Sequence, residues 1–174
     1  MKTFLEIGTC DFDTLNHLSD DGWRGVIVEP IKKYLNNIPQ LPNIHYLNYA
    51  VDWECGTRTM YLADDSIVSE DHDFAGMSSF YPYSSVLTQE VVVNTITFDK
   101  IYNMCDITEI DLLKIDTEGH DYEILQMLFR NPIKPKYIQA EIKHLNSTIG
   151  IVDLLDLHGY HSTISGDNIF AILK

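Results

Sequence analysis

Four carboxylates crowd into one short stretch of the sequence. The segment KIDTEGHDYEIL, residues 114–125, contains Asp116, Glu118, Asp121 and Glu123 and overlaps the end of an apolar run. Acidic groups directly after a buried strand can serve as general bases, whereas acidic groups in the first turn of a helix are stabilised by its dipole. We therefore expect Asp116 and Glu118 to carry chemistry, and Asp121 and Glu123 to begin a helix.

A further carboxylate and a histidine lie in the strand-like segment YIQAEIKH, residues 137–144. Glu141 and His144 would both lie at the carboxyl end of this strand, and Asp116 and Glu141 would lie on adjacent strands. The placement makes both residues, together with Asp116 and Glu118, candidates for proton transfer. A divalent ion held by Asp116 and Glu141 is an open alternative, because oxygen ligands suit such ions. The structural alternative, in which these groups are only solvated strand ends, also stays open.

Alternating strand and helix signals must position these groups. Short apolar, β-branched segments predict strands, and apolar residues at helical spacing predict the helices between them. The predicted strands are residues 3–8, 25–30, 44–51, 110–116, 136–143 and 168–174, and the predicted helices lie around residues 13–18, 31–37, 124–129 and 151–155. Asp13 is the expected cap of the first helix. The alternation is typical of a doubly wound, mostly parallel α/β sheet, in a single domain over residues 1–174.

Two further strand signals, residues 57–63 and 91–98, break this alternation, because only a polar segment separates them. A loop of this length in a compact domain is more often functional than a plain connector. Its hydroxyls and aromatic rings could hold a sugar or another polar acceptor, or they could belong to a flexible surface loop. These side chains are Met77, Ser78, Ser79, Phe80, Tyr81 and Tyr83.

The first two predicted strands end in residues that suit a nucleoside-containing cofactor. Gly8 permits a tight turn after the first strand. Glu29 follows the second strand about twenty positions later, where an acidic group can accept hydrogen bonds from a ribose diol. A nicotinamide cofactor would normally need further glycines, and residues 9–13 supply none. S-adenosylmethionine, which has no phosphate and carries a sulfonium cation, fits better than the cofactor of a nicotinamide-dependent oxidoreductase.

The bulk properties exclude several classes of protein. The chain has 174 residues and a formal net charge of -14, and such a charge repels nucleic acid. It has no apolar run near the roughly 18 residues of a membrane span. The start, MKTFLEIGTC, is broken by Glu6 and does not fit a signal peptide. Three cysteines without CxxC spacing suggest neither disulfides nor a zinc cluster. We expect a cytoplasmic protein with no membrane and no nucleic-acid partner.

Six segments resemble, in order and spacing, the FkbM-like S-adenosylmethionine-dependent methyltransferases. These segments are LEIGTCDFDTL, VIVEP, NYAVDWECG, AGMSSF, VNTITFDKIY and, most specifically, IDLLKIDTEGHDYEIL, and together they span about residues 3–144. The resemblance implies a class I methyltransferase fold, a Rossmann-like sheet of about seven strands with one antiparallel strand. It also implies methylation of a hydroxyl group, often on a sugar or another small polar acceptor.

The resemblance assigns roles around the first motif. Glu6, Gly8 and Cys10 would border the methionine part of the cofactor, and Glu29 would hold its ribose. The family's first motif usually reads D-x-G-A-N-x-G, and Phe12 stands where the second glycine is expected. This departure keeps a non-catalytic, methyltransferase-like binding module open as the alternative function. Members of the family also commonly carry residues ahead of this motif that help to cover the site, so a pocket completed by a partner chain, as in a homodimer, is open as well.

The resemblance also places residues at the ends of the third and fourth strands. Ala50, Val51 and Asp52 would border the adenine, and Asp116 would face the methionine end of the cofactor and the reaction centre. The sequence thus predicts an S-adenosylmethionine-dependent methyltransferase that acts on a hydroxyl of a small or carbohydrate acceptor.

Overall fold

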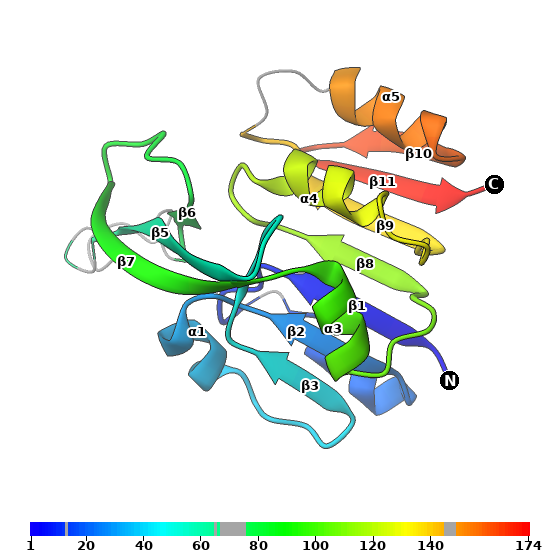
Figure 1. Ribbon diagram of the computed structural model, residues 1–174, viewed down its shortest axis with the longest axis horizontal. Helices are drawn as coiled ribbons and strands as arrows, with labels where there is room; N and C mark the ends of the chain where they lie inside the picture. Colours follow the sequence, from blue (N-terminus) through cyan, green and yellow to red (C-terminus); the bar gives the residue numbers. More distant parts are fainter. Residues whose placement is uncertain (13, 65, 67–75, 145–148) are drawn as a thin grey trace.

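A seven-stranded sheet forms the centre of the computed structural model, which describes residues 1–12, 14–64, 66, 76–144 and 149–174 (Figure 1). In spatial order its strands are β3 (Ile44–Leu47), β2 (Arg24–Val28), β1 (Thr3–Ile7), β8 (Leu112–Ile115), β9 (Tyr137–Glu141), β11 (Asn168–Leu173) and β10 (Tyr160–Ser165). Neighbouring strands run parallel except at β11, which is antiparallel to both β9 and β10. This confirms the predicted class I methyltransferase architecture with a single antiparallel strand.

Helices cover both faces of this sheet. The helices α3 (Phe98–Met104), α4 (Asp121–Leu128) and α5 (Ile149–Leu157) pack on one face, and the 3-10 helix η1 (Leu15–Asp21) and α1 (Lys32–Asn37) pack on the other. Side chains of a strand alternate between faces. In β1, Leu5 therefore joins the larger core beside α3 to α5, while Phe4 joins the smaller core beside η1 and α1. Burial on both faces explains why this strand reads as a continuous apolar run.

Two details of the predicted elements need comment. Thr14 caps η1, because its side chain accepts a hydrogen bond from the Asn16 amide; the predicted cap, Asp13, lies outside the described residues. The strand predicted over residues 91–98 ends at Ile96, and α3 begins at Phe98. In the described part of the chain, no helix is long and apolar enough to cross a membrane.

A second, four-stranded sheet projects beyond the carboxyl ends of the central strands (Figure 1). Its order is β4 (Ala50–Val51), β7 (Leu87–Ile96), β5 (Gly56–Ala63) and β6 (Ser78–Ser79). The predicted strands 57–63 and 91–98 thus pair as an antiparallel hairpin of β5 and β7. The prediction of one strand over residues 44–51 is wrong, because the chain leaves the central sheet after Leu47 and β4 pairs with β7 instead.

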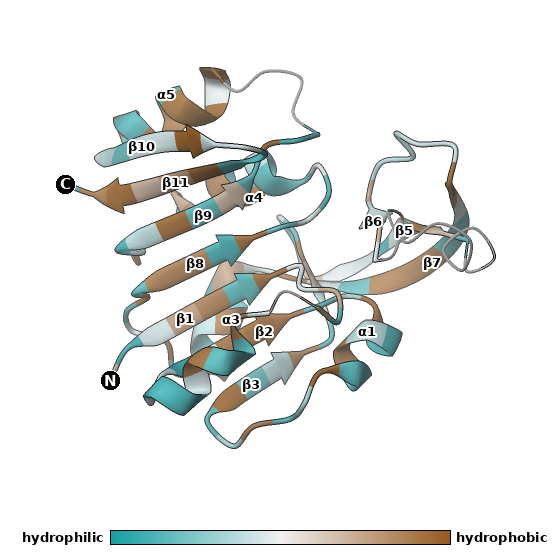
Figure 2. Ribbon diagram, turned by 180° about the vertical axis from the view of Figure 1, so that it is seen from behind, coloured by the Kyte–Doolittle hydropathy of each residue, from teal (hydrophilic) through white to brown (hydrophobic). Residues whose placement is uncertain are grey.

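The sheet face opposite α4 and α5 carries exposed apolar side chains. Tyr137, Phe170 and Ile172 lie on the paired strands β9 and β11 and are 52%, 43% and 44% exposed. Seen from behind, β8, β9, β11 and β10 have no described helix in front of them (Figure 2).

Candidate functional site

A cleft opens at the carboxyl edge of the central sheet, where β1, β2 and β8 end beneath the second sheet. The space between its walls is about 830 Å³, a volume that includes the part open to solvent. Ligands of open α/β sheets bind at this edge. Eight of the eleven residues that the sequence assigns to catalysis or to cofactor binding line the cleft: Gly8, Cys10, Glu29, Ala50, Val51, Asp116, Glu118 and Glu141.

Gly8 is required by close packing between two strand ends. Its backbone has φ +75, and a Cβ atom added there would lie 1.9 Å from the carbonyl oxygen of Asp116. The amide of Asp116 donates to the carbonyl of Ile7, so β1 and β8 stay joined up to the cleft. The glycine predicted as a turn therefore also brings the two strand ends together beneath the cleft.

Glu29 organises the loop that follows β1. Its Oε2 accepts hydrogen bonds from the amides of Thr9 (3.2 Å) and Cys10 (2.9 Å), and its Oε1 accepts one from the Ile31 amide (2.8 Å). Burial raises the pKa of Glu29 to about 7, although these three donors act in the opposite direction. Each carboxylate oxygen can accept more than one hydrogen bond. Glu29 can therefore hold the loop and still accept a hydrogen bond from a ligand.

Cys10 has a left-handed backbone with φ 51 and borders the same loop. Burial raises the pKa of its thiol well above the usual range, so the group is a neutral wall of the cleft and not a thiolate nucleophile. All three cysteines of the chain are free thiols, in agreement with their spacing in the sequence.

Glu6 is not among the residues that line the cleft. It is fully buried and lies opposite Lys114 in the register of β1 and β8, and the Lys114 ammonium donates to Glu6 Oε1 at 3.2 Å. Glu6 Oε2 accepts hydrogen bonds from the Thr14 hydroxyl at 2.7 Å and the Leu15 amide at 2.9 Å. Its carboxylate thus anchors the start of η1, a structural task that the first motif alone did not reveal.

Asp52 also stands apart from the lining, although the neighbouring Ala50 and Val51 belong to it. The guanidinium of Arg58 donates to Asp52 Oδ2 at 2.9 Å, across the turn between β4 and β5. Asp52 Oδ1 lies 3.8 Å from Nε2 of His120. Asp52 therefore holds the start of β5 against the end of β4 through Arg58, while the two residues before it form the cleft wall.

The four carboxylates of residues 116–123 take different positions. Asp121 is buried in the first turn of α4, where it accepts hydrogen bonds from the Thr117 hydroxyl (3.0 Å) and the amides of Thr117 and Gly119. Burial, with repulsion from Asp116 as the second cause, raises the pKa of Asp121 to about 7. Glu123 also lies in the first turn and is about one-third exposed. The pair expected to begin a helix does so, and Asp121 additionally fixes the loop that carries Glu118.

Glu118, Glu141 and His144 come together beside the cleft. Nε2 of His144 lies 2.8 Å from Oε2 of Glu118, and one ligand atom from each of the three residues falls within 4.8 Å of the others. Burial is the largest cause that raises the pKa of Glu141 to about 8, followed by repulsion from Asp116 and Glu118. The expected adjacency of Asp116 and Glu141 is confirmed, because β8 and β9 pair in parallel up to Ile115.

The polar segment between β5 and β7 reaches this cluster. The Ser79 hydroxyl donates to the carbonyl of Glu118 at 2.6 Å, and the Tyr83 hydroxyl donates to its carboxylate at 2.9 Å. The ring of Tyr83 stacks on His144 with 4.3 Å between centroids. Phe80 lines the cleft and meets the ring of His120 edge to face. The segment predicted to be functional therefore closes over the acidic end of the cleft.

Several residues that line the cleft were not predicted from the sequence. Lys114 lies on β8, two positions before Asp116, and the alternation of side chains along this strand could have revealed it. Thr9 was hidden between the two residues assigned from the first motif. Met60 gave no signal, because it comes from β5 of the second sheet and reaches the cleft only through the tertiary fold.

Three buried polar atoms at the cleft have no hydrogen-bond partner. They are Oγ1 of Thr9, Nε2 of His120 and Oε2 of Glu141. Burial lowers the pKa of His120, so its ring is held neutral with one nitrogen available as an acceptor. Buried polar groups are normally hydrogen-bonded, and unpaired groups that converge on one cleft are what a polar ligand would satisfy.

Three solved structures have backbones similar to this chain. The fibrillarin/Nop5p complex contains a chain with 16% identity and a TM-score of 0.48, covering 99% of this chain and 72% of that one. A precorrin-6y C5,15-methyltransferase from Geobacter metallireducens has 13% identity and a TM-score of 0.49, covering 98% and 78%. A putative methyltransferase from Thermoplasma acidophilum has 11% identity and a TM-score of 0.47, covering 99% and 68%.

The sequence itself carries the family assignment. No protein of curated function matches it significantly. The profile of the methyltransferase FkbM domain matches residues 6–162, which include the first motif, the Asp116 segment and all three residues of the Glu118, Glu141 and His144 cluster. The chain therefore belongs to the FkbM methyltransferase domain family.

Proposed function

We propose that the protein transfers the methyl group of S-adenosylmethionine to a hydroxyl of a sugar or another small polar acceptor. Membership of a methyltransferase family supports the reaction and the cofactor. The observation that carries the choice of acceptor is the convergence of Asp116, Glu118 and Glu141 on one end of the cleft. A hydroxyl is a weak nucleophile until a base relieves it of its proton, and carboxylates can do this.

The residues at the other end of the cleft fit the cofactor. Glu29 would accept hydrogen bonds from the ribose, and Ala50 and Val51 would border the adenine. Gly8 and Cys10 would border the methionine part, where the unpaired hydroxyl of Thr9 is a further contact. When bound, S-adenosylmethionine would supply an electrophilic methyl group, whose bond to sulfur breaks as a hydroxyl oxygen attacks the carbon, with S-adenosylhomocysteine as the leaving group.

The acidic end would hold and deprotonate the acceptor. Asp116 follows the last residue of β8 and lines the cleft, so its carboxylate is our candidate for the group that receives the proton. Tyr83 and Phe80 place aromatic faces beside this end, and such faces pack against the apolar face of a sugar ring while hydroxyls and carboxylates bind its polar edge. Much of the rate would come from positioning the acceptor oxygen in line with the methyl group.

Calorimetric titration with S-adenosylhomocysteine and with NADH tests the cofactor. We expect S-adenosylhomocysteine to bind and NADH not to bind. The reverse result would favour the nicotinamide-dependent oxidoreductase and overturn the proposal. Binding of S-adenosylhomocysteine without turnover of any acceptor in a broad panel of hydroxyl compounds would favour the non-catalytic binding module.

The variant Asp116→Asn tests the reaction centre. The substitution keeps the size of the side chain and removes the charge, so turnover should fall by about 10² to 10⁴ while the free energy of unfolding changes little. Asp153→Asn, an exposed position on α5, is the matched control. Normal turnover of Asp116→Asn would remove this residue from the reaction centre.

A further inference from the structure

The cluster of Glu118, Glu141 and His144 has the composition of a metal site. Two carboxylates and one imidazole offer two oxygen ligands and one nitrogen ligand. Their potential ligand atoms all lie within 4.8 Å of one another, and the shortest separation is the 2.8 Å between Oε2 of Glu118 and Nε2 of His144. Around an octahedral ion with bonds of about 2.1 Å, adjacent ligand atoms are about 3 Å apart and opposite ones about 4.2 Å. The three side chains therefore need only small movements to share one ion.

A second observation points to a ligand at this cluster. Oε2 of Glu141 is buried and has no hydrogen-bond partner. A buried carboxylate oxygen without a donor is costly. Glu118 already accepts hydrogen bonds from Tyr83 and pairs with His144, so it does not offer a donor to Glu141. A cation between the three residues would satisfy the unpaired oxygen.

The charges around the cluster favour a cation. Asp116 and Asp121 both act on Glu141 with repulsion, in addition to Glu118, and the opposing attraction comes from Lys143. A divalent ion neutralises such a concentration of negative charge more completely than a single ammonium group can, because the interaction energy scales with the product of the charges. An anionic ligand in the same place would face repulsion from every one of these carboxylates.

Neighbouring groups hold each of the three ligand residues in place. Glu118 adopts a left-handed backbone with φ 53, and the Ser79 hydroxyl from β6 fixes its carbonyl. Glu141 is the last residue of β9, where its backbone is held in register opposite Asn168 of β11. The Tyr83 ring stacks on the imidazole of His144. Ligands that are positioned by their neighbours in this way lose little freedom when they bind an ion.

We propose that Glu118, Glu141 and His144 bind one divalent cation of the Mn²⁺ or Mg²⁺ class. Carboxylates suit both ions, and the imidazole shifts the preference toward Mn²⁺. Three protein ligands leave three positions of an octahedral shell for water and for an acceptor oxygen. Binding of the cation does not depend on the proposed function, whereas its role in catalysis rests on that function. In that role, a cation here would lower the pKa of an acceptor hydroxyl, and Asp116 would receive the proton.

The site differs from the one that sequence reasoning left open. From the sequence, Asp116 and Glu141 were the expected pair of ligands for a divalent ion. The structure gathers Glu141 with Glu118 and His144, and Asp116 is not among the three. Asp116 is thereby left for proton transfer.

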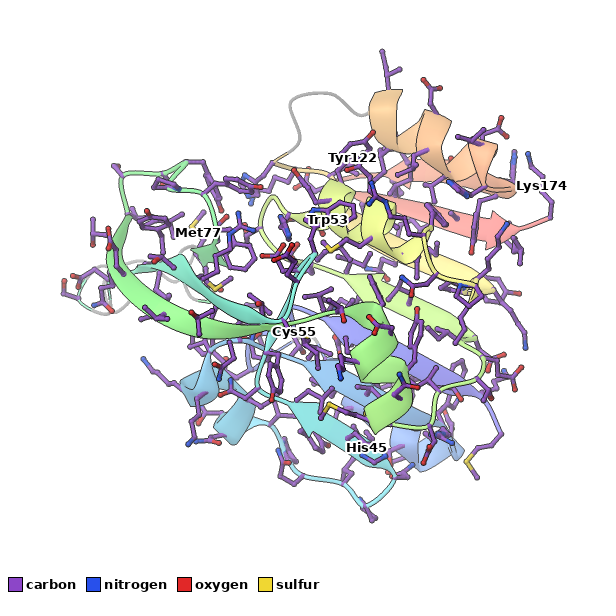
Figure 3. The ribbon with its side chains drawn as sticks, viewed as in Figure 1. His45, Trp53, Cys55, Met77, Tyr122 and Lys174 are labelled. Atoms are coloured by element: carbon purple, nitrogen blue, oxygen red, sulfur yellow. The ribbon has the colours of Figure 1, made fainter. Side chains whose placement is uncertain are left out.

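Titration of the full chain with MnCl₂, followed by electron paramagnetic resonance of free Mn²⁺, tests the site. We expect one bound Mn²⁺ per chain. Glu141→Gln and His144→Gln should each weaken Mn²⁺ binding at least tenfold. The matched controls are Glu90→Gln on β7 and His45→Gln on β3, both exposed; His45 lies near the start of β3, away from the carboxyl edge (Figure 3). Equal affinity of the cluster variants and the controls would overturn the proposal, as would the absence of Mn²⁺ binding at millimolar concentration.

A spectroscopic measurement on the unmodified protein does not depend on the folding of any variant. Bound Mn²⁺ should show hyperfine coupling to an imidazole nitrogen, and its absence would overturn the ligand role of His144. Titration with S-adenosylhomocysteine separates the two proposals. Cofactor binding without Mn²⁺ binding would overturn the cation site alone, and Mn²⁺ binding without cofactor binding would overturn the proposed function alone.

Discussion

The carbonyl oxygen of Asp116 occupies the space that a side chain on Gly8 would need. An added Cβ would lie 1.9 Å from this oxygen, and the backbone of Gly8 has φ +75. Position 8 thus requires glycine, because the backbone of Asp116, directly after the neighbouring strand β8, fills the space beside it. The two ends of the cleft, one assigned to the cofactor and one to the acceptor, meet at this contact.

Gly8→Ala should lower the free energy of unfolding by about 2 to 5 kcal/mol, because it adds a left-handed backbone penalty to a steric clash. Urea unfolding measures the change. Gly22→Ala is the matched control, since Gly22 has φ +77 and nothing within 4 Å of its added Cβ. It should cost only about 1 to 2 kcal/mol. Equal losses for the two variants would show that the contact with Asp116 is relaxed in solution.

Glu29→Ala should weaken the binding of S-adenosylhomocysteine by about 1 to 3 kcal/mol, because a buried diol would lose its acceptor. Calorimetric titration measures the affinity, and circular dichroism checks that the variant is folded. The control is Glu90→Ala, which removes an exposed carboxylate from β7. Unchanged affinity in Glu29→Ala would mean that the cofactor lies elsewhere.

Glu29 should also make the cofactor-free protein less stable as the pH rises. Burial raises its pKa from the ordinary 4.5 to about 7 in the folded chain, so between these values the folded state binds more protons than the unfolded state. Its contribution is full below pH 4.5 and is lost as the pH rises through about 7. At 1.36 kcal/mol per pH unit, the loss is on the order of 3 kcal/mol.

Urea unfolding at pH 5 and pH 8 checks this dependence. Glu29→Gln cannot titrate, so the difference between the two pH values should be smaller in the variant than in the original chain. Glu90→Gln should leave the difference unchanged. The same pH dependence in all three proteins would contradict a buried, proton-binding Glu29.

Asp121 and Glu123 should respond differently to truncation, although both lie in the first turn of α4. Asp121→Ala removes a buried acceptor from the Thr117 hydroxyl and from two amides, so it should lower the free energy of unfolding by about 1 to 3 kcal/mol. Glu123→Ala removes a partly exposed group whose charge interacts favourably with the helix dipole, an effect of about 0.3 to 1 kcal/mol. Chemical unfolding compares the two. A larger loss for Glu123→Ala would contradict these roles.

The sequence by itself determined the alternation of strands and helices and the positions of the residues at the strand ends. Buried parallel strands must be apolar on both faces, so residues 3–8, 25–30 and 110–116 were recognisable. The glycine turn at Gly8 and the acid at Glu29 followed from local backbone and hydrogen-bonding needs. The strand β10 was missed because YHSTIS lies at the sheet edge and is largely polar and exposed.

Only the tertiary structure decided what each acidic group does. Glu6 and Glu29 both follow apolar residues in strands, yet Glu6 pairs with Lys114 inside the fold and Glu29 borders the cleft. The cluster of Glu118, Glu141 and His144 joins a loop, a strand end and the residues beyond it. Hydrophobic periodicity indicates which face of a helix or strand is buried. The distance between two carboxylates depends instead on the register of the strands and on which segments pack over the ends of these strands. That information appears only when the chain is folded.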